Sequence, residues 1–70
     1  SVMPPRPSDL LSAIYGVLAA EKRAVNDYMN GKAKAIDYLV GAVLRKLKGM
    51  AVDPVLVRRL IIEALSGHGA

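Results

Sequence analysis

The 70-residue sequence contains no cysteine, tryptophan or phenylalanine, and it has a single histidine, His68. Without cysteine, neither a disulfide nor a thiolate metal site can stabilise so short a chain. One histidine in a glycine-rich end cannot form an imidazole metal site or a catalytic triad, so we expect no metal and no cofactor. The core must then be built from aliphatic side chains, and a hydrophobic content of 53% can supply it.

Long apolar runs are also missing. The longest uncharged apolar run is Leu10–Ala20, well short of the roughly 20 residues needed to cross a bilayer. Pro4, Pro5 and Pro7 interrupt any signal-peptide core near the start of the sequence. We therefore expect no membrane span, and the lack of cysteine fits a cytoplasmic protein.

Prolines and a change of periodicity divide the first half of the chain. Residues 1–7 contain three prolines and are predicted to form a non-helical, disordered linker. A first helix of about Asp9–Ala20 follows, with Ser8 or Asp9 itself as its cap. The apolar spacing loses phase at Glu21–Arg23, which indicates a turn or kink before a short second helix of about Ala24–Met29.

The second half contains clearer boundaries. Asn30-Gly31 predicts a left-handed stop, and a third and longest helix should run from residue 32 or 33 to residue 47 or 48. Asp53 as N-cap and Pro54 at the first helical position predict a last helix of about Pro54–Leu65. Ser66-Gly67 should end this helix.

No strand pattern is evident, so we predict an all-α fold. The expected architecture is a small, orthogonally packed bundle of about four helices. Residues 8–66 would form the domain, residues 67–70 a flexible end, and the isolated domain a monomer.

The third helix has two distinct faces, because successive residues of a helix lie 100° apart. Its apolar face, predicted to be buried, contains Ile36, Leu39, Val40, Val43 and Leu47. Its opposite face contains Lys34, Tyr38, Gly41, Arg45 and Lys48.

The basic residues are concentrated near this helix. The net charge is +4, and between Lys32 and Arg59 the sequence has seven basic residues against Asp37 and Asp53. A local excess of this kind favours polyanions, although a solvated basic face would have the same composition. Lys34, Arg45 and Lys48 lie on one side of the helix and could follow a phosphate backbone together.

Gly41 and Tyr38 allow two interpretations each. Glycine within a helix costs about 1 kcal/mol relative to alanine, so Gly41 indicates close approach of another backbone, either RNA or a neighbouring helix. Tyr38 points toward the basic residues and would either stack on a base or ribose, or complete the core. Tyr28 is expected in the core.

Two further bases are candidate contacts. Lys32 follows the Gly31 turn near a helix N-terminus, where phosphate binding is favourable. Arg58 lies on the polar side of the last helix with Arg59, where either an extension of the basic face or surface salt bridges would explain it.

The sequence contains, in order, the patterns DY-x-x-GK-x-KA, YLVG-x-V, KG-x-A, P-x-x-V and EAL. This order resembles the GatB/YqeY tail domain, which closes the B subunit of the tRNA-dependent amidotransferases and is similar to free-standing YqeY-like proteins and to an extension of some bacterial glutaminyl-tRNA synthetases. The matching residues are Asp27, Tyr28, Gly31, Lys32, Lys34, Ala35, Leu39, Val40, Gly41, Val43, Lys48, Gly49, Ala51, Pro54, Val57, Glu63, Ala64 and Leu65.

The resemblance implies a non-catalytic helical module that contacts the body of tRNA by phosphate and shape, as part of a larger amidotransferase or synthetase. Its partners would be tRNA and the remainder of that parent enzyme. The alternative is a helical protein–protein docking module. An independent enzyme is not expected, because the chain offers no acid–base pair, nucleophile dyad or metal-ligand set. The residues proposed for tRNA binding are Lys32, Lys34, Tyr38, Gly41, Arg45, Lys48 and Arg58.

Overall fold

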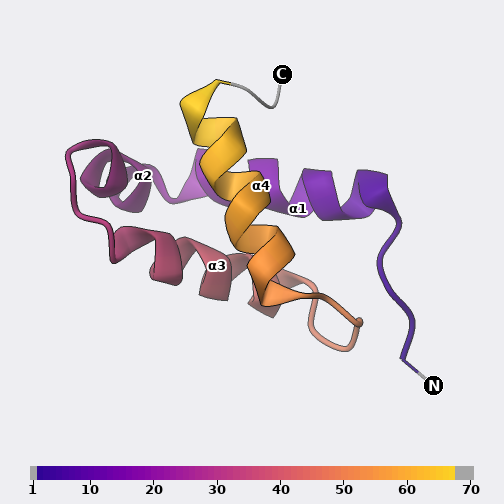
Figure 1. Cartoon of the computed structure of the whole chain (residues 1–70). Coiled ribbons are helices and arrows are strands. Elements are labelled where there is room, and N and C mark those ends of the chain that lie inside the picture. Colours follow the sequence, from indigo (N-terminus) through magenta and orange to yellow (C-terminus); the bar gives the residue numbers. More distant parts are fainter. Residues whose placement is uncertain (1, 68–70) are drawn as a thin grey trace.

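The computed structural model describes residues 2–67 and contains four helices over that range (Figure 1). They are α1 (Pro7–Ala20), α2 (Lys22–Met29), α3 (Ala35–Lys46) and α4 (Pro54–Ser66). No strand occurs in the described range, so the predicted all-α fold of about four helices is confirmed. Among these residues, no helix has both the length and the apolar character needed to cross a membrane.

The start of α1 differs from the prediction. The helix begins at Pro7, with extended Arg6 as its N-cap, and neither Ser8 nor Asp9 makes a side-chain cap bond. Proline is favourable at this position because its missing N–H would have had no helical partner. The Arg6 carbonyl accepts hydrogen bonds from the backbone N–H groups of Asp9 and Leu10, both at 3.0 Å. The expected cap at Ser8 or Asp9 was therefore wrong.

Residues 2–6 precede the helix in non-helical conformation. Besides the bonds of Arg6 to the first turn of α1, the segment makes a backbone hydrogen bond in which Ala51 N–H donates to the Met3 carbonyl at 3.0 Å. The segment therefore lies against the connection between α3 and α4.

The predicted breaks lie where the periodicity changes. Glu21 separates α1 from α2 with φ −102° and ψ 55°, and α2 begins at Lys22, two residues before the predicted start. After Asn30, Gly31 has φ 95°, in the left-handed region that glycine adopts without strain. The Asn30-Gly31 stop is confirmed.

The third helix is shorter than predicted. Residues 32–34 form a turn in which Ala35 N–H donates to the Lys32 carbonyl and Asp37 N–H to the Lys34 carbonyl, each at 3.0 Å. These i to i+3 bonds are tighter than the α-helical pattern, as is common where helices begin. At the other end Leu47 is the C-cap of α3.

The last helix agrees closely with its local sequence signals. Asp53 Oδ1 accepts a hydrogen bond from Val55 N–H at 2.9 Å, Pro54 occupies the first helical position, and Gly67 follows the helix with φ 82°. The predicted cap and stop are confirmed. Of the predicted flexible end 67–70, residues 68–70 lie outside the described residues.

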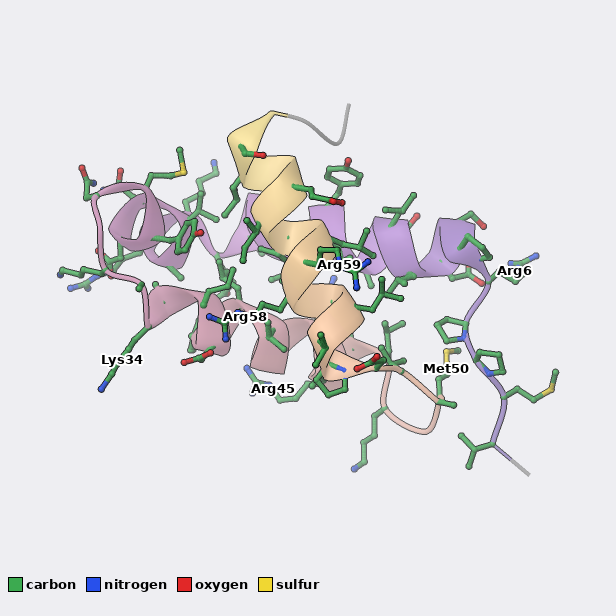
Figure 2. All side chains as sticks on the ribbon, in the orientation of Figure 1. Arg6, Lys34, Arg45, Met50, Arg58 and Arg59 are labelled. Carbon is green, nitrogen blue, oxygen red and sulfur yellow. The ribbon has the colours of Figure 1, made fainter. Side chains whose placement is uncertain are left out.

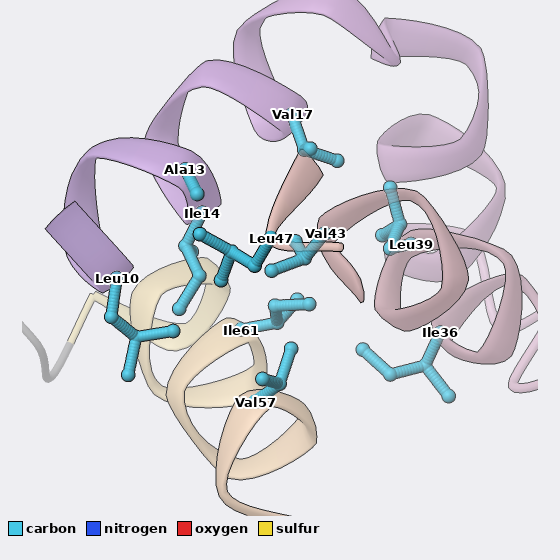
Figure 3. Packing of buried hydrophobic residues seen from close by; sticks show 10 residues of the cluster. All are labelled: Leu10, Ala13, Ile14, Val17, Ile36, Leu39, Val43, Leu47, Val57 and Ile61. Carbon is cyan, nitrogen blue, oxygen red and sulfur yellow. The ribbon is translucent and has the colours of Figure 1, made fainter. Parts of the chain in front are cut away.

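The core is aliphatic and centred on α3, which packs against all three other helices (Figure 3). In Figure 1, α4 crosses both α1 and α3 steeply, in agreement with the predicted orthogonal packing. The buried side chains are Leu10, Ala13, Ile14, Val17, Ile36, Leu39, Val43, Leu47, Val57 and Ile61.

Some residues of the predicted core lie at its margin. Val40 is only half-buried, because it lies on the side of α3 that faces the edge of α4 rather than the centre of the bundle. In α4, Leu60 and Leu65 are partly buried against the core, and Tyr28 packs against it as predicted.

This difference in burial predicts that replacing different apolar side chains of α3 with alanine lowers the free energy of unfolding by unequal amounts. Leu39 has no exposed surface, so Leu39→Ala should lower the free energy of unfolding by about 2–5 kcal/mol. Val40→Ala should cost clearly less, since its site can be filled by solvent and by neighbouring side chains. Urea denaturation followed by circular dichroism measures both values. Equal losses in the two variants would contradict the observed orientation of α3.

Candidate nucleic-acid interface

One face of α3 remains uncovered by the other helices. Lys34, Tyr38, Arg45 and Lys48 are exposed on it and Gly41 is half-exposed, and we call these five residues the outer strip. Figure 2 shows Lys34 and Arg45 projecting from the same side of α3. The 12 residues of α3 span about 18 Å at 1.5 Å per residue, which is long enough to meet several phosphates of one RNA strand.

The two ends of the outer strip lie in turns rather than in the helix itself. Lys34 is the N-cap residue, but its φ of −66° and ψ of −17° are helical, so it continues the path of α3. Lys48 lies in the closing turn, where its N–H donates to the Arg45 carbonyl at 3.4 Å. The predicted face therefore exists, although it extends beyond the regular helix at both ends.

The cations of the outer strip keep their charge available. In the part of the chain that the structure describes, no salt bridge involves Lys34, Arg45 or Lys48. An anion that approaches this face would not have to displace a bound carboxylate from any of the three side chains.

Gly41 lies in the middle of the outer strip and is not covered by another helix. Apart from the backbone of α3 itself, a Cβ atom built on it would have Arg45 Nη1 as its only neighbour within 4 Å, at an ordinary contact distance of 3.5 Å, within the described structure. Close packing against another helix, one of the two explanations for this glycine, is therefore wrong. Its lack of a side chain leaves the helix backbone accessible from outside.

The other two predicted contact residues take part in ion pairs away from the outer strip. Lys32 Nζ lies 3.8 Å from Asp27 Oδ1, and Arg58 Nη1 lies 3.4 Å from Asp37 Oδ1. Figure 2 shows Arg58 on the side of α4 that faces α3. Both pairs are exposed and contribute little to stability, about 0–1 kcal/mol. Each nevertheless reduces the charge available to an outside partner.

Tyr38 connects the outer strip to a second feature. Its side chain is 54% exposed, in contrast to Tyr28, so Tyr38 is not a core residue. Hydrogen bonding to the Glu21 carboxylate, together with the negative charge of that group, raises the pKa of the Tyr38 hydroxyl, and the charge of Arg45 opposes this rise. The hydroxyl thus lies close to both Glu21 and Arg45.

Beside Tyr38 the surface is hollowed into a pocket of about 360 Å³. We call it the α2–α3 pocket; its lining residues are Ala20, Glu21, Lys22, Arg23, Ala24, Asp27, Ala35 and Tyr38. Glu21 and Asp27 were not among the predicted site residues, because only the fold brings them to Tyr38. Two sequence features marked this region: the loss of periodicity at Glu21 and the DY-x-x-GK-x-KA pattern, which contains Asp27 and Ala35. Within residues 2–67, no group of three histidines or carboxylates is placed to hold a metal ion.

The environment of Gly41 predicts the effect of adding a methyl group there. Gly41→Ala should raise the free energy of unfolding by about 0.5–1 kcal/mol, because alanine is the better helix former and the new Cβ meets open space and one flexible side chain. Gly31→Ala is the matched control and should destabilise, since its φ of 95° strains any side chain. Thermal and urea unfolding compare the two. Destabilisation by Gly41→Ala would mean that another part of the protein covers this position.

The contact between Tyr38 and Glu21 predicts a shift in titration. The Tyr38 hydroxyl should lose its proton above the usual pKa of about 10, and Glu21→Gln should lower that pKa by removing the negative charge. Because the folded-state pKa is raised, the stabilisation is present below about pH 10 and is lost as the pH rises through the folded-state pKa. NMR of the tyrosine ring carbons measures each pKa separately. An unchanged Tyr38 pKa in the variant would contradict the contact.

Comparison with known proteins agrees with the fold and with the pattern of residues. The sequence profile of the GatB domain matches residues 3–65. Over 60 residues, or 86% of its length, the chain is 42% identical to the B subunit of the aspartyl/glutamyl-tRNA(Asn/Gln) amidotransferase of Methanopyrus kandleri. It is 46% identical over 80% of the chain to the protein of the same name from Thermus thermophilus, and 34% identical over 83% to one from Clostridium acetobutylicum.

The match covers most of this chain but a small part of each relative. The aligned region accounts for 13% of the Methanopyrus protein and 12% of the other two. No solved structure matches the chain. The profile match over almost the whole sequence, together with these identities, shows that the chain belongs to the GatB domain family.

Proposed function

We propose that this domain is a non-catalytic tRNA-binding module of a larger tRNA-dependent amidotransferase. The observation that supports the proposal most directly is the outer strip, an exposed face with three cations around a glycine that no other helix covers within the described structure. The relatives, whose names describe them as amidotransferase subunits for aspartyl- and glutamyl-tRNA, favour an amidotransferase over a synthetase as the parent.

The chemistry of the outer strip suits a phosphate backbone. Lys34, Arg45 and Lys48 would each neutralise a phosphate and release a condensed counterion, which favours binding independently of sequence. Arg45 and Gly41 lie one turn apart, so a phosphate held by Arg45 could approach the helix backbone beside Gly41. Contacts of this kind position an RNA helix by shape and charge.

The remainder of the parent would supply catalysis and most of the tRNA affinity. The chain spans about an eighth of the relatives it matches, so in such a protein it would be tethered near an already bound tRNA. Tethering converts its weak contacts into an intramolecular association with a high effective concentration. The complex would operate in the cytoplasm, where tRNA is aminoacylated.

Removing charge from the outer strip provides the test. In the full-length parent, Arg45→Ala with Lys48→Ala should weaken tRNA binding for every tRNA that the enzyme accepts. The slope of log affinity against log salt should fall by about 0.7–0.9 for each phosphate interaction that the substitutions remove. Filter binding or fluorescence anisotropy across a salt series measures both quantities.

A control with equal charge loss makes the result specific. Arg6 and Arg59 lie away from the outer strip, Arg6 beyond the start of α1 and Arg59 on the last helix (Figure 2). Arg6→Ala with Arg59→Ala should affect tRNA binding much less than the outer-strip pair. Equal effects would indicate a general charge contribution. No effect of either pair at moderate salt would overturn the proposal and favour a protein–protein docking role for this face.

A further inference from the structure

The α2–α3 pocket has no role in the phosphate contacts described above. It lies where the end of α1, the start of α2 and the first turns of α3 meet, and Tyr38 belongs both to it and to the outer strip. Its volume of about 360 Å³ lies within the range of small-ligand pockets, roughly 300–1,000 Å³. It therefore has room for a planar group the size of a nucleobase.

We propose that the α2–α3 pocket binds one unpaired guanine base of the RNA that lies on the outer strip. This proposal rests on the proposed function and extends it, because it gives the domain a contact that distinguishes one base from another. The argument depends on three properties of the lining: an aromatic ring beside small apolar side chains, two carboxylates, and two flanking cations.

The apolar part of the lining suits a flat ring. Part of the lining consists of the small side chains of Ala20, Ala24 and Ala35, and Tyr38 provides a half-exposed aromatic surface beside them. Protein recognition of single-stranded RNA commonly uses such a surface, on which an unstacked base is held against an aromatic side chain. A base that enters here would exchange stacking within the RNA for stacking on Tyr38.

The carboxylates give the pocket its chemical preference. Ionised Glu21 and Asp27 are acceptors only, and each offers about four lone-pair sites. The 3.8 Å pair of Lys32 with Asp27 involves one oxygen of that carboxylate, and the Tyr38 hydroxyl close to Glu21 can occupy at most one site there, so acceptor sites remain on both groups. Guanine is the base whose Watson–Crick edge presents two adjacent N–H donors, N1–H and the N2 amino group. Adenine, cytosine and uracil each present an acceptor next to their donor, which a carboxylate would repel.

The flanking cations explain how an acidic pocket can accept a segment of a polyanion. Lys22 and Arg23 are exposed at the start of α2 and also line the pocket. Their charges balance those of Glu21 and Asp27 and provide phosphate contacts on either side of an inserted nucleoside. Lys34 immediately precedes Ala35 of the pocket wall, so the backbone could continue from here onto the outer strip.

The test uses the complete chain and short single-stranded RNA. Fluorescence-labelled pentanucleotides with uridine at the outer positions would carry guanosine, inosine, adenosine, cytidine or uridine at the centre. Guanosine should bind most tightly, and inosine, which lacks the N2 amino group, less tightly. NMR shifts should concentrate on Glu21, Asp27 and Tyr38.

Variants separate the stacking contribution from the hydrogen-bonding contribution. Tyr38→Ala should weaken binding of the guanosine oligonucleotide about tenfold through lost stacking, whereas Tyr38→Phe should retain most of it. Glu21→Gln should reduce the preference for guanosine over adenosine while leaving the all-uridine oligonucleotide unaffected. Tyr15→Ala is the matched control, since this tyrosine is 48% exposed but lies on α1, outside the pocket lining. It should not change the affinity for any of the oligonucleotides.

The outcomes distinguish this proposal from the proposed function. Equal binding of all five oligonucleotides, or a guanosine preference that is undiminished in Glu21→Gln, would overturn the guanine pocket while leaving the outer-strip result intact. Free GMP that binds as tightly as the guanosine oligonucleotide would overturn the assignment to RNA and indicate a free nucleotide instead. If Arg45→Ala with Lys48→Ala leaves tRNA binding unchanged while the guanosine preference remains, the result would count against the proposed tRNA contact alone.

Discussion

The contact of α3 with all three other helices determines both the stability of this domain and the surface it presents. Leu39 and Val43 are fully enclosed, and Ile36 and Leu47 extend the same stripe toward the ends of the helix. Because α1, α2 and α4 all pack on this inner side, the opposite side of α3 has to face outward. The described residues include no buried polar or charged side chain, so folding leaves the charged groups at the surface. An aliphatic core thus orients the cations of the outer strip without any direct bond to them.

The interruptions between helices shape the rest of the surface. At Glu21 the chain leaves helical geometry for one residue, which lets α2 start in a new direction while the Glu21 carboxylate remains beside Tyr38. Gly31 and Gly49 take left-handed conformations that let the chain reverse on each side of α3. Residues on both sides of the Glu21 break line one wall of the α2–α3 pocket, and Ala35 and Tyr38 line the other after the turn at Gly31. The pocket therefore depends on two interruptions of helical geometry rather than on any one helix.

Sequence reasoning succeeded where local chemistry determines the structure. Asp53 and Pro54 define the start of α4 through a capping bond and a preset φ, and both act within one turn. The predicted start of α1 was wrong because a proline breaks a helix only in its interior, whereas at the first helical position it is favourable. The prediction that Val40 is buried was inaccurate because periodicity gives a direction on the helix but not the extent of the neighbours that cover it. The ion pair of Arg58 with Asp37, and the approach of Glu21 to Tyr38, depend on distances between elements that no sequence pattern gives.

The arrangement of charge suggests a division between affinity and discrimination under the proposed function. The three cations of the outer strip would bind any phosphate backbone, and three such contacts give only weak, salt-sensitive association on their own. Weak binding suits a domain that makes up about an eighth of relatives such as these, since tethering raises its effective concentration without making release slow. A contact that selects one base adds affinity only for RNA in which that base is present and unpaired, so complexes without it are less stable. Acidic residues near Tyr38 would weaken a purely electrostatic surface. Under the proposed function they instead exclude bases whose Watson–Crick edge lacks two adjacent N–H donors, while the adjacent cations bind the RNA backbone.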